Sequence, residues 1–383
     1  MLESSYIVLS RSAYKKNYNY ITKILGPNIR FSSVIKVNAY GHGIDKFVPI
    51  AEWAGVRHFA AFSADEAYLV KQASTKKSGI MIMGYLSDDQ LEWAIENEIE
   101  YYMFDLNRLK ISIMTAQKIG KKAKIHIEVE TGFHRTGFER SEFDEVIRLL
   151  KSGADDLDFE GLCTHYAGAE SISNHVRVKQ QYETYMEIYS RFLESGVRPK
   201  YRHTAGSAAS LTYPETIMDM VRVGIAQYGF WPSPETLIHR FKKYDAKDSD
   251  LKRLLSWKTK VMEVKEIDVG EFVGYGTSYM AYEKKKIAII PVGYSNGFSR
   301  SLSNSGRVLI HGVYVLVVGV VTMNTTTVDI THVPNVVPGD EVVLIGKQKR
   351  QEISIASFCE MSNMLNYQLL ARLPQSIPRF ITP

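Results

Sequence analysis

One stretch of the sequence decides the fold, HFAAFSADEAYLVKQASTKKSGIMIMGYLSDDQLEWAIENE (58–98). It holds one pattern twice, because a short apolar run is followed each time by a longer segment with helical spacing. Ser63 and Glu66 have the spacing of a capping box, and Ser87 precedes the second helical segment. The stretch therefore predicts two consecutive units, each with one strand and one helix.

The same alternation extends over most of the chain. Ser141 is expected to start a further helix, and the longest helical segment runs from Asn174 to Gly196. Eight apolar runs are predicted as strands, at 32–37, 58–63, 80–85, 101–105, 124–130, 159–166, 201–207 and 220–229. Eight strand–helix units predict a closed (β/α)8 barrel, a TIM-like α/β fold. An open doubly wound sheet is the alternative if one strand is misassigned.

The texture of the sequence changes near residue 242. A charged linker, KKYDAKDSDLKR (242–253), leads into strand-rich sequence with glycine and proline between the strands. Strands are expected at 259–267, 285–294, 306–321 and 340–346, with a turn at 337–340 and a short helix at 355–361. We therefore expect a barrel domain over residues 1–242 and a second, mainly β domain over residues 243–383.

Composition excludes several classes of protein. Hydrophobic residues make up 45% of the 383 positions and charged residues 23%, which excludes a disordered or collagen-like chain. The net charge of +5 has no basic block, so we expect no nucleic-acid partner. The longest apolar run, 313–321, is far shorter than the ~20 residues of a membrane span, so we expect no membrane partner.

The cysteines and the start of the sequence indicate a compartment. Two cysteines are too few for a disulfide framework or a zinc cluster and are typical of a reducing environment. The first ten residues lack the basic and apolar regions of a signal peptide. We therefore expect a cytoplasmic protein, and the scattered histidines predict no metal site.

Polar residues gather at the carboxyl ends of the predicted strands, where barrels carry their chemistry. Lys36 ends the first run, Arg135 follows the fifth, His165 ends the sixth, Ser207 ends the seventh and Arg222 lies in the eighth. A lone strand-end lysine usually reaches into solvent, but a desolvated one has a lowered pKa and can form a Schiff base with an aldehyde. Agreement among five strands favours the second interpretation for Lys36.

A phosphate group is the ligand that the small residues suggest. Ser207 offers a hydroxyl, and the backbone near Gly224 and Ile225 offers N–H groups that a ligand can approach closely. The sequence holds no P-loop or dinucleotide fingerprint, so the phosphate is expected to belong to a small cofactor.

Several motifs in order resemble those of the alanine racemases, over nearly the whole chain. They are VIKVNAYGHG, TGFHRTGF, EGLCTHYAGAE, MVRVGIAQYG, VGYGTSY and IPVGYSNG. The resemblance implies a barrel with a β domain, pyridoxal phosphate (PLP) as cofactor, and a head-to-tail homodimer with shared active sites. It also implies interconversion of L- and D-alanine, which supplies D-alanine for peptidoglycan.

The resemblance also assigns roles to residues of this chain. Lys36 matches the lysine that holds the cofactor and serves as base on one face of the substrate, and Tyr275, from the partner subunit, matches the acid/base on the other face. His165 matches the residue stacked on the cofactor ring, Arg222 the partner of its nitrogen, and Arg135 the arginine near the substrate carboxylate. The phosphate-binding set matches Tyr40, Ser207, Gly224, Ile225 and Tyr367. Met323 matches a residue that meets the substrate carboxylate, and Tyr294 one at the mouth of the channel.

Two residues have chemical consequences in this scheme. A guanidinium cannot accept a proton, so Arg222 would keep the ring nitrogen unprotonated and limit side reactions; we expect Arg222→Glu to increase transamination. Glu128 stands where many family members carry a carbamylated lysine, and we expect it to pair with Arg135 without modification. Further departures at Asn324, Val320 and Gly206 leave the preferred amino acid open.

Other functions remain as alternatives. A serine or broad-specificity racemase would share all the motifs. A non-catalytic PLP-binding protein would give Tyr275 and the second domain no purpose. A PLP decarboxylase would need an acidic residue where Arg222 lies, and in a phosphate-binding barrel without PLP the lysine at 36 would be incidental.

Overall fold

The computed structural model describes residues 4–244, 250–362 and 366–383. The chain forms two compact units. The barrel unit contains Ala13–Ala39 and Phe47–Arg253, and the β unit contains the residues up to Ser12, Tyr40–Lys46 and Leu254–Pro383. The predicted domain boundary at residues 242 and 243 lies near the passage at Arg253 and Leu254, and it stays a prediction.

The barrel unit confirms the predicted α/β barrel. Eight parallel strands follow the order β8-β7-β6-β5-β4-β3-β2-β9, and a parallel bridge between Gly206 and Arg222 nearly closes the ring. Each predicted run overlaps one of them: β2 (Arg30–Val34), β3 (His58–Ala61), β4 (Gly79–Ile82), β5 (Glu100–Met103), β6 (Ala123–Glu128), β7 (Leu157–Cys163), β8 (Tyr201–His203) and β9 (Met220–Val223).

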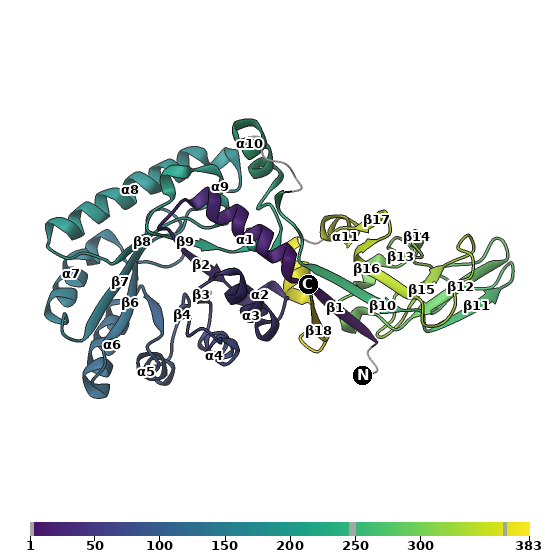
Figure 1. Cartoon of the computed structure of the whole chain (residues 1–383), viewed down its shortest axis with the longest axis horizontal. Helices are drawn as coiled ribbons and strands as arrows, with labels where there is room; N and C mark the ends of the chain where they lie inside the picture. The colour runs from purple at the N-terminus through teal and green to yellow at the C-terminus, as the bar shows by residue number, and fades with distance from the viewer. Residues whose placement is uncertain (1–3, 245–249, 363–365) are drawn as a thin grey trace. The chain divides into compact units, whose positions relative to one another are not determined.

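Helices surround these strands, as Figure 1 shows for α4 to α8. The helices are α1 (Arg11–Leu25), α2 (Lys36–Tyr40), α3 (Ile44–Ala54), α4 (Ala64–Ala73), α5 (Asp88–Glu96), α6 (Leu106–Ile119), α7 (Phe143–Ser152), α8 (His175–Glu194), α9 (Ser207–Thr212) and α10 (Pro234–Tyr244). Short 3-10 turns are η1 (Arg140–Glu142), η2 (Ile172–Asn174), η3 (Pro214–Thr216) and η4 (Ile225–Tyr228).

The helix starts largely follow the predicted caps. Ser63 Oγ accepts a hydrogen bond from the Glu66 backbone N–H at 3.3 Å and begins α4. At α5, the Gln90 side chain accepts from the Ser87 N–H at 3.1 Å. The expected start at Ser141 is wrong, because this serine lies inside η1 and α7 begins two residues later.

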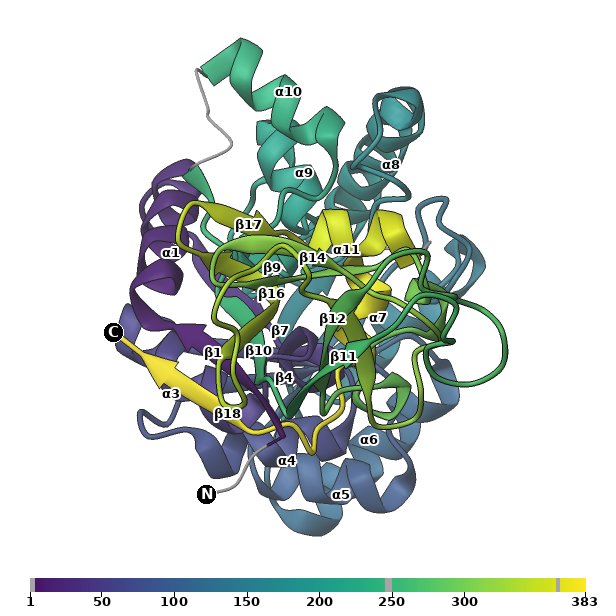
Figure 2. The ribbon, with the colours of Figure 1, turned by 90° about the vertical axis from the view of Figure 1, so that its right-hand side faces the viewer.

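The β unit carries two sheets. One has the order β14-β13-β16-β10-β1-β18 with β17 on β16, and the other has the order β11-β12-β15. Figure 2 shows β1, β10 and β16 side by side. The strands are β1 (Ser5–Ser10), β10 (Leu255–Lys260), β11 (Glu263–Ile267), β12 (Lys285–Ile290), β13 (Arg307–Ile310), β14 (Val313–Leu316), β15 (Thr326–Asp329), β16 (Glu341–Gln348), β17 (Gln351–Ile353) and β18 (Arg379–Thr382).

Two predicted strands of this unit are each divided. The run 259–267 breaks because the Val261 N–H bonds Asp340 O while the Met262 N–H bonds Ile289 O, so the chain changes sheets. The run 306–321 folds into a β13–β14 hairpin, whose turn residues His311 and Gly312 both have positive φ. The predicted short helix is confirmed as α11 (Ile355–Ser362), and it is followed by α12 (Asn366–Arg372) and preceded by the turns η6 (Tyr294–Asn296) and η7 (Arg300–Leu302).

Both cores are apolar and contain large side chains. In α7 the buried residues recur at helical spacing, from Phe143 through Val146 to Leu150. In the β unit, Trp257, Phe298 and Phe358 are fully buried with ring centroids 5.5–6.5 Å apart. Within the residues that the structure describes, no helix has the length and apolar content of a membrane span.

Candidate active site

Lys36 follows β2 and opens a left-handed turn. The next four residues, Val37, Asn38, Ala39 and Tyr40, have φ between 51° and 55°. For L-amino acids this conformation costs about 1–2 kcal/mol per residue, and it is least favourable for a β-branched residue such as Val37. Hydrogen bonds hold the turn, from the Ala39 N–H to Ile35 O at 2.7 Å and from the Asn38 N–H to Glu66 Oε1 at 3.3 Å. Strained backbone of this kind concentrates at functional sites, which marks Lys36 as one.

Four charged or ionisable side chains of the barrel unit interact electrostatically. Burial lowers the pKa of Lys36, and the positive charge of Arg135 lowers it further, while Glu66 opposes the shift. Burial lowers the pKa of His165 to about 3, with further contributions from the charges of Arg222, Arg135 and Lys36. The charges of Lys36, Arg135 and Arg222 therefore influence the ionisation of this group.

Arg222 is held firmly in the barrel interior. Its side chain is buried, with 6% of the residue exposed. Nη1 donates to His203 Nδ1 at 2.5 Å and to His203 O at 2.6 Å, and Nη2 donates to Thr164 O at 2.7 Å and to Thr204 O at 3.0 Å. This permanent cation is thus fixed by three carbonyls and one imidazole.

Two short helical turns begin side by side at the predicted phosphate site. Ser207 begins α9 and Ile225 begins η4, and Ser207 Oγ accepts from the Gly224 N–H at 2.9 Å and from the Ala226 N–H at 3.4 Å. With both acceptor positions used, the hydroxyl proton of Ser207 is left to donate. Helix starts and a hydroxyl donor in one place suit a phosphate group.

The loop that carries Arg135 is held by the carboxylate of Glu130. Glu130 accepts hydrogen bonds from the backbone N–H groups of Gly132, Phe133 and His134. These bonds lower its pKa although burial acts in the opposite direction. Sequence reasoning missed this role for Glu130, although its place one residue before the TGFHRTG loop was a signal.

The predicted pair between Glu128 and Arg135 is present as a long contact. Arg135 Nη2 lies 3.8 Å from Glu128 Oε1, and Thr136 Oγ1 donates to Glu128 Oε2 at 2.7 Å. Glu128 is buried, which raises its pKa, whereas the Arg135 side chain is half-exposed. The guanidinium also lies 4.7 Å from the Phe133 ring centre. The buried carboxylate therefore restrains Arg135 from one side and leaves it open on the other.

In the β unit, the two tyrosines of the predicted phosphate set lie together. The rings of Tyr40 and Tyr367 are 6.3 Å apart, and Tyr367 lies on α12. Gly41 follows Tyr40 with φ +74°, and a Cβ there would lie 2.1 Å from Leu370 O. Arg379 Nη2 donates to Gly41 O at 3.0 Å, so the turn after Tyr40 is fastened from two sides.

Tyr275 lies at the tip of a hairpin. Phe272 and Met280 form an antiparallel bridge, and the Val273 N–H donates to Tyr279 O at 3.0 Å. Gly274 and Gly276 flank the tyrosine with positive φ, so the turn depends on glycine. Tyr275 is 75% exposed in this chain. Its phenol therefore projects away from its own unit.

Met323 and Asn324, where the sequence departs from the family pattern, are exposed in the β unit. Met323 is 57% exposed, and its carbonyl accepts from the Ser295 N–H at 3.0 Å and the Ser295 hydroxyl at 2.7 Å. Asn324 Nδ2 donates to Ser295 Oγ at 3.0 Å, next to Tyr294. The amide of Asn324 is thus engaged within the β unit.

Gly206 and Val320 are the remaining departures. Gly206 caps α9 in the barrel unit, and a Cβ there would lie 3.8 Å from His165 Cε1 and 3.8 Å from Arg222 O. A Cβ at 206 would therefore fit without a clash, so glycine leaves room for a methyl group beside His165. Val320 is half-buried in the β unit.

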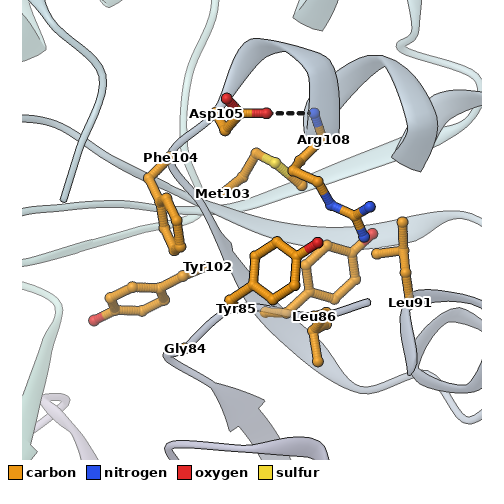
Figure 3. A pocket seen from close by; sticks show the side chains of 10 residues that line it. Gly84, Tyr85, Leu86, Leu91, Tyr102, Met103, Phe104, Asp105 and Arg108 are labelled. Atoms are coloured by element: carbon orange, nitrogen blue, oxygen red, sulfur yellow. Dashed lines mark hydrogen bonds between the residues drawn. The ribbon is translucent and has the colours of Figure 1, made fainter. Parts of the chain in front are cut away.

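A small cavity lies at the carboxyl ends of β4 and β5 (Figure 3). Tyr85, Tyr102 and Phe104 line it, and the Arg108 guanidinium lies 5.3 Å from the Tyr85 ring centre. The Asp105 carboxylate accepts from the Arg108 backbone N–H at 2.8 Å and caps α6. The volume of the cavity, about 20 Å³, suits a single water molecule. The cavity is therefore too small for a cofactor.

Comparison with known proteins gives a consistent result. Residues 9–232 match the family model for the alanine racemase N-terminal domain, and residues 254–381 match that for the alanine racemase C-terminal domain. An alanine racemase of Methanococcus maripaludis is 32% identical over 370 residues, covering 96% of each chain.

Solved structures agree. The alanine racemase from Bacillus anthracis with bound L-Ala-P is 30% identical, with a TM-score of 0.90 over 100% of this chain and 96% of that chain. The alanine racemase from Bartonella henselae with covalently bound pyridoxal phosphate is 25% identical, with a TM-score of 0.82 over 99% of both chains.

Proposed function

Because the chain belongs to the alanine racemase family, we propose that it interconverts L- and D-alanine with PLP as its cofactor. The observation that carries the proposal is the set around Lys36, a partly desolvated lysine that precedes a strained left-handed turn and is grouped with Arg135, His165 and Arg222. When bound, PLP acidifies the Cα proton of an amino acid joined to it. Lys36 and Tyr275 would then move that proton on opposite faces of the substrate.

The residues present fit PLP. The Ser207 hydroxyl and the Ile225 N–H would hold its phosphate, together with the phenols of Tyr40 and Tyr367, while the Gly224 N–H donates to Ser207 Oγ and would orient that hydroxyl. His165 would lie against its ring, and its lowered pKa keeps the imidazole neutral at physiological pH. Arg222 would donate to the ring nitrogen and, as a permanent cation, would accept no proton from it.

Lys36 is suited to the role of base. Its lowered pKa raises the fraction of neutral amine at neutral pH, which a general base requires. The left-handed turn behind it fixes the backbone from which the side chain extends. A matched acid on the other face is needed, because racemisation returns the proton to the opposite side.

Arg135 and Met323 would bind the substrate carboxylate. A guanidinium suits a carboxylate because it donates two parallel hydrogen bonds. Glu128 lies behind Arg135 and would orient it without a modified lysine. The backbone N–H of Met323 would supply a further donor.

A second copy of the chain would supply Tyr275. Exposed apolar side chains lie on the barrel unit at Val37, Phe62 and Tyr85, and on the β unit at Phe272, Met280 and Tyr282. Exposed apolar surface of this kind is typical of an interface. A head-to-tail homodimer would cover both surfaces and bring each Tyr275 to the Lys36 of its partner.

Two measurements test the proposal. The purified protein should racemise alanine, and after borohydride reduction the peptide containing Lys36 should carry the mass of the cofactor.

Lys36→Ala and Tyr275→Phe proteins should each be inactive, but mixing them under conditions of subunit exchange should restore activity. In a hybrid dimer one site regains both residues only if Tyr275 comes from the partner. Absence of restored activity after verified exchange would refute the shared site.

A serine-accepting or broad-specificity racemase is the second candidate. The space beside His165 at Gly206 and the engagement of Asn324 by Ser295 favour it. Turnover of alanine, serine and lysine, compared under one condition, separates the candidates. We further propose a cytoplasmic location and a supply of D-alanine to peptidoglycan; a requirement for added D-alanine for growth after deletion of the gene tests the latter.

A further inference from the structure

A continuous chain of buried hydrogen bonds crosses the interior of the barrel. Glu100 Oε2 lies 2.9 Å from His126 Nε2, His126 Nδ1 lies 2.8 Å from His203 Nε2, and His203 Nδ1 lies 2.5 Å from Arg222 Nη1. These four residues come from β5, β6, β8 and β9, and all are buried. Barrel interiors are usually filled by apolar branched side chains, so a polar chain here requires an explanation.

Further polar side chains bind Glu100, at one end of this chain of hydrogen bonds. Arg30 Nη2 donates to Glu100 Oε1 at 3.1 Å, and His58 Nε2 lies 3.0 Å from Glu100 Oε2. His58 Nδ1 lies 2.9 Å from Ser32 Oγ. Glu100 therefore serves as the acceptor for three side chains, which is the role of an ionised carboxylate.

Arg222 determines which atom donates and which accepts in each hydrogen bond of this chain. A guanidinium only donates, so His203 Nδ1 must be an acceptor and the proton of this neutral imidazole must lie on Nε2. That proton is donated to His126 Nδ1, which places the His126 proton on Nε2, and Glu100 accepts it. Burial lowers the pKa of His203, in agreement with a neutral ring.

Two glycines make room for the chain. Gly161 lies on β7 between the strands of His126 and His203, and a Cβ there would lie 2.1 Å from His126 Nδ1 and 2.8 Å from His203 Nε2. Gly79 begins β4, and a Cβ there would lie 2.9 Å from both Arg30 Nη2 and His58 Cδ2. Neither has a positive φ, so space rather than backbone conformation requires glycine at both positions.

We propose that Glu100 and His126 are positioning residues that hold His203 in its Nε2–H tautomer, so that a lone pair always faces Arg222. With the other tautomer, an N–H of His203 would oppose an N–H of Arg222, and the guanidinium would have to turn. The inference rests on the proposed function only for its consequence in turnover. The tautomer itself is a property of the barrel.

The first test is made on the wild-type protein, and variants serve only to assign its resonances. In protein labelled with ¹⁵N-histidine and loaded with PLP, His126 and His203 should each show an unprotonated Nδ1 and a protonated Nε2 at neutral pH. Single His126→Asn and His203→Asn proteins assign the two resonances. A protonated Nδ1 on His203 in the wild-type protein overturns the proposal.

The second test compares two glycine substitutions. Gly161→Ala places a methyl group between His126 and His203, and we expect a mixture of His203 tautomers and a kcat lower by about 10- to 100-fold, as for other supporting shells. KM should change far less than kcat. Gly153→Ala, whose methyl group would instead meet Leu149 O and Ile113 away from this chain, is the control and should leave the His203 tautomer and kcat close to their wild-type values. An unchanged tautomer in Gly161→Ala, or equal loss of kcat in both variants, overturns the proposal.

A third variant addresses the carboxylate. In Glu100→Gln one side of the amide must donate, so it opposes either Arg30 or the two imidazoles. We expect the His203 signals to show both tautomers, as in Gly161→Ala, and Glu100→Gln with wild-type signals would count against the anchoring role. If the wild-type protein failed to racemise alanine while its tautomers were as stated, the proposed function would fail and the positioning chain would stand.

Discussion

The candidate residues of the barrel unit and those of the β unit are held in opposite ways. Arg222, Ser207 and Glu128 are buried and hydrogen-bonded within the barrel unit, whereas Tyr275 and Met323 are exposed on turns. The barrel positions its groups because eight strands end at one rim. The β unit presents its groups outward, because hairpin tips have few neighbours within their own unit.

This difference shows how the proposed site is divided between folding and assembly. Barrel residues reach their positions when the chain folds, and burial changes the pKa of several of them. Tyr275 gains its surroundings only when another surface covers it. Substitutions on the barrel side should therefore affect stability and chemistry together, and those on the β unit should affect chemistry alone.

The largest expected effect comes from the barrel side. Lys36→Ala should lower kcat/KM for alanine by about 10⁴-fold, because both the cofactor attachment and one base are lost. The rate of D-alanine formation and the mass of the borohydride-treated protein measure the two losses. Lys46→Ala, an exposed lysine, serves as the control and should behave as wild type. If the Lys36→Ala protein kept both its activity and the cofactor mass, Lys36 would be neither the attachment site nor a base.

The next effect comes from the β unit. Tyr275→Phe should lower kcat by about 10³-fold through loss of a general acid/base. Its free energy of unfolding should change by no more than about 0.5 kcal/mol, since the side chain is largely exposed. Urea unfolding and the racemisation rate measure the two quantities. Tyr282→Phe, at 71% exposure in the same segment, is the matched control and should keep its activity. A loss of stability without a loss of rate would reverse the assignment.

Acid should destabilise the barrel through its buried imidazoles. Burial lowers the pKa of His58 and His203, and it lowers that of His165 to about 3. Below pH ~6.5 the unfolded imidazoles therefore bind more protons than the native ones do, so this stability is present above this pH and falls as the pH decreases. The slope should approach ~1.4 kcal/mol per pH unit for each imidazole that stays neutral in the native barrel.

Urea unfolding at several pH values and a fixed PLP concentration measures this slope. His58→Gln, which removes one of these imidazoles, should reduce it. A slope below that of one proton between pH 6.5 and 5 would contradict the buried neutral imidazoles.

The smallest expected effect tests the carboxylate clamp. Glu128→Gln should raise the KM for alanine by about 10-fold, because the ion pair that orients Arg135 is lost. The contact is long and Arg135 is half-exposed, so a larger loss is not expected. Glu187→Gln, which breaks an exposed ion pair with Arg140, is the control and should leave KM unchanged. Unaltered substrate affinity in Glu128→Gln would show that the barrel rim orients Arg135 by other means.

How far the sequence predicted the fold differs between the two units. Each barrel strand is a local apolar run with its own helix behind it, so all eight were predictable. In the β unit, the run 259–267 looks continuous, yet it splits between two sheets because Val261 and Met262 have different partners far along the chain. The strand β1 was missed altogether, since its pairing with β10 joins residues about 250 positions apart.

The site divides in the same way. Lys36, Arg135, His165, Ser207 and Arg222 were identified because each ends or follows a strand, which is a local pattern. The motif resemblance then supplied Tyr40, Tyr275, Met323 and Tyr367. Glu100 and His126 were missed, although polar residues within apolar strands were a visible signal. Their meaning depends on Gly161, which lies on a different strand.

The amino-acid sequence alone determined the family, the strand–helix alternation and the strand ends that carry polar groups, because these follow from local hydrophobic periodicity and from motifs. Only the tertiary structure decided the left-handed turn after Lys36, where local preference is overruled by packing. It also decided the bond between His126 and His203, which are 77 residues apart. The physical reason is that a hydrogen bond depends on distance and direction in space, and a sequence pattern records neither.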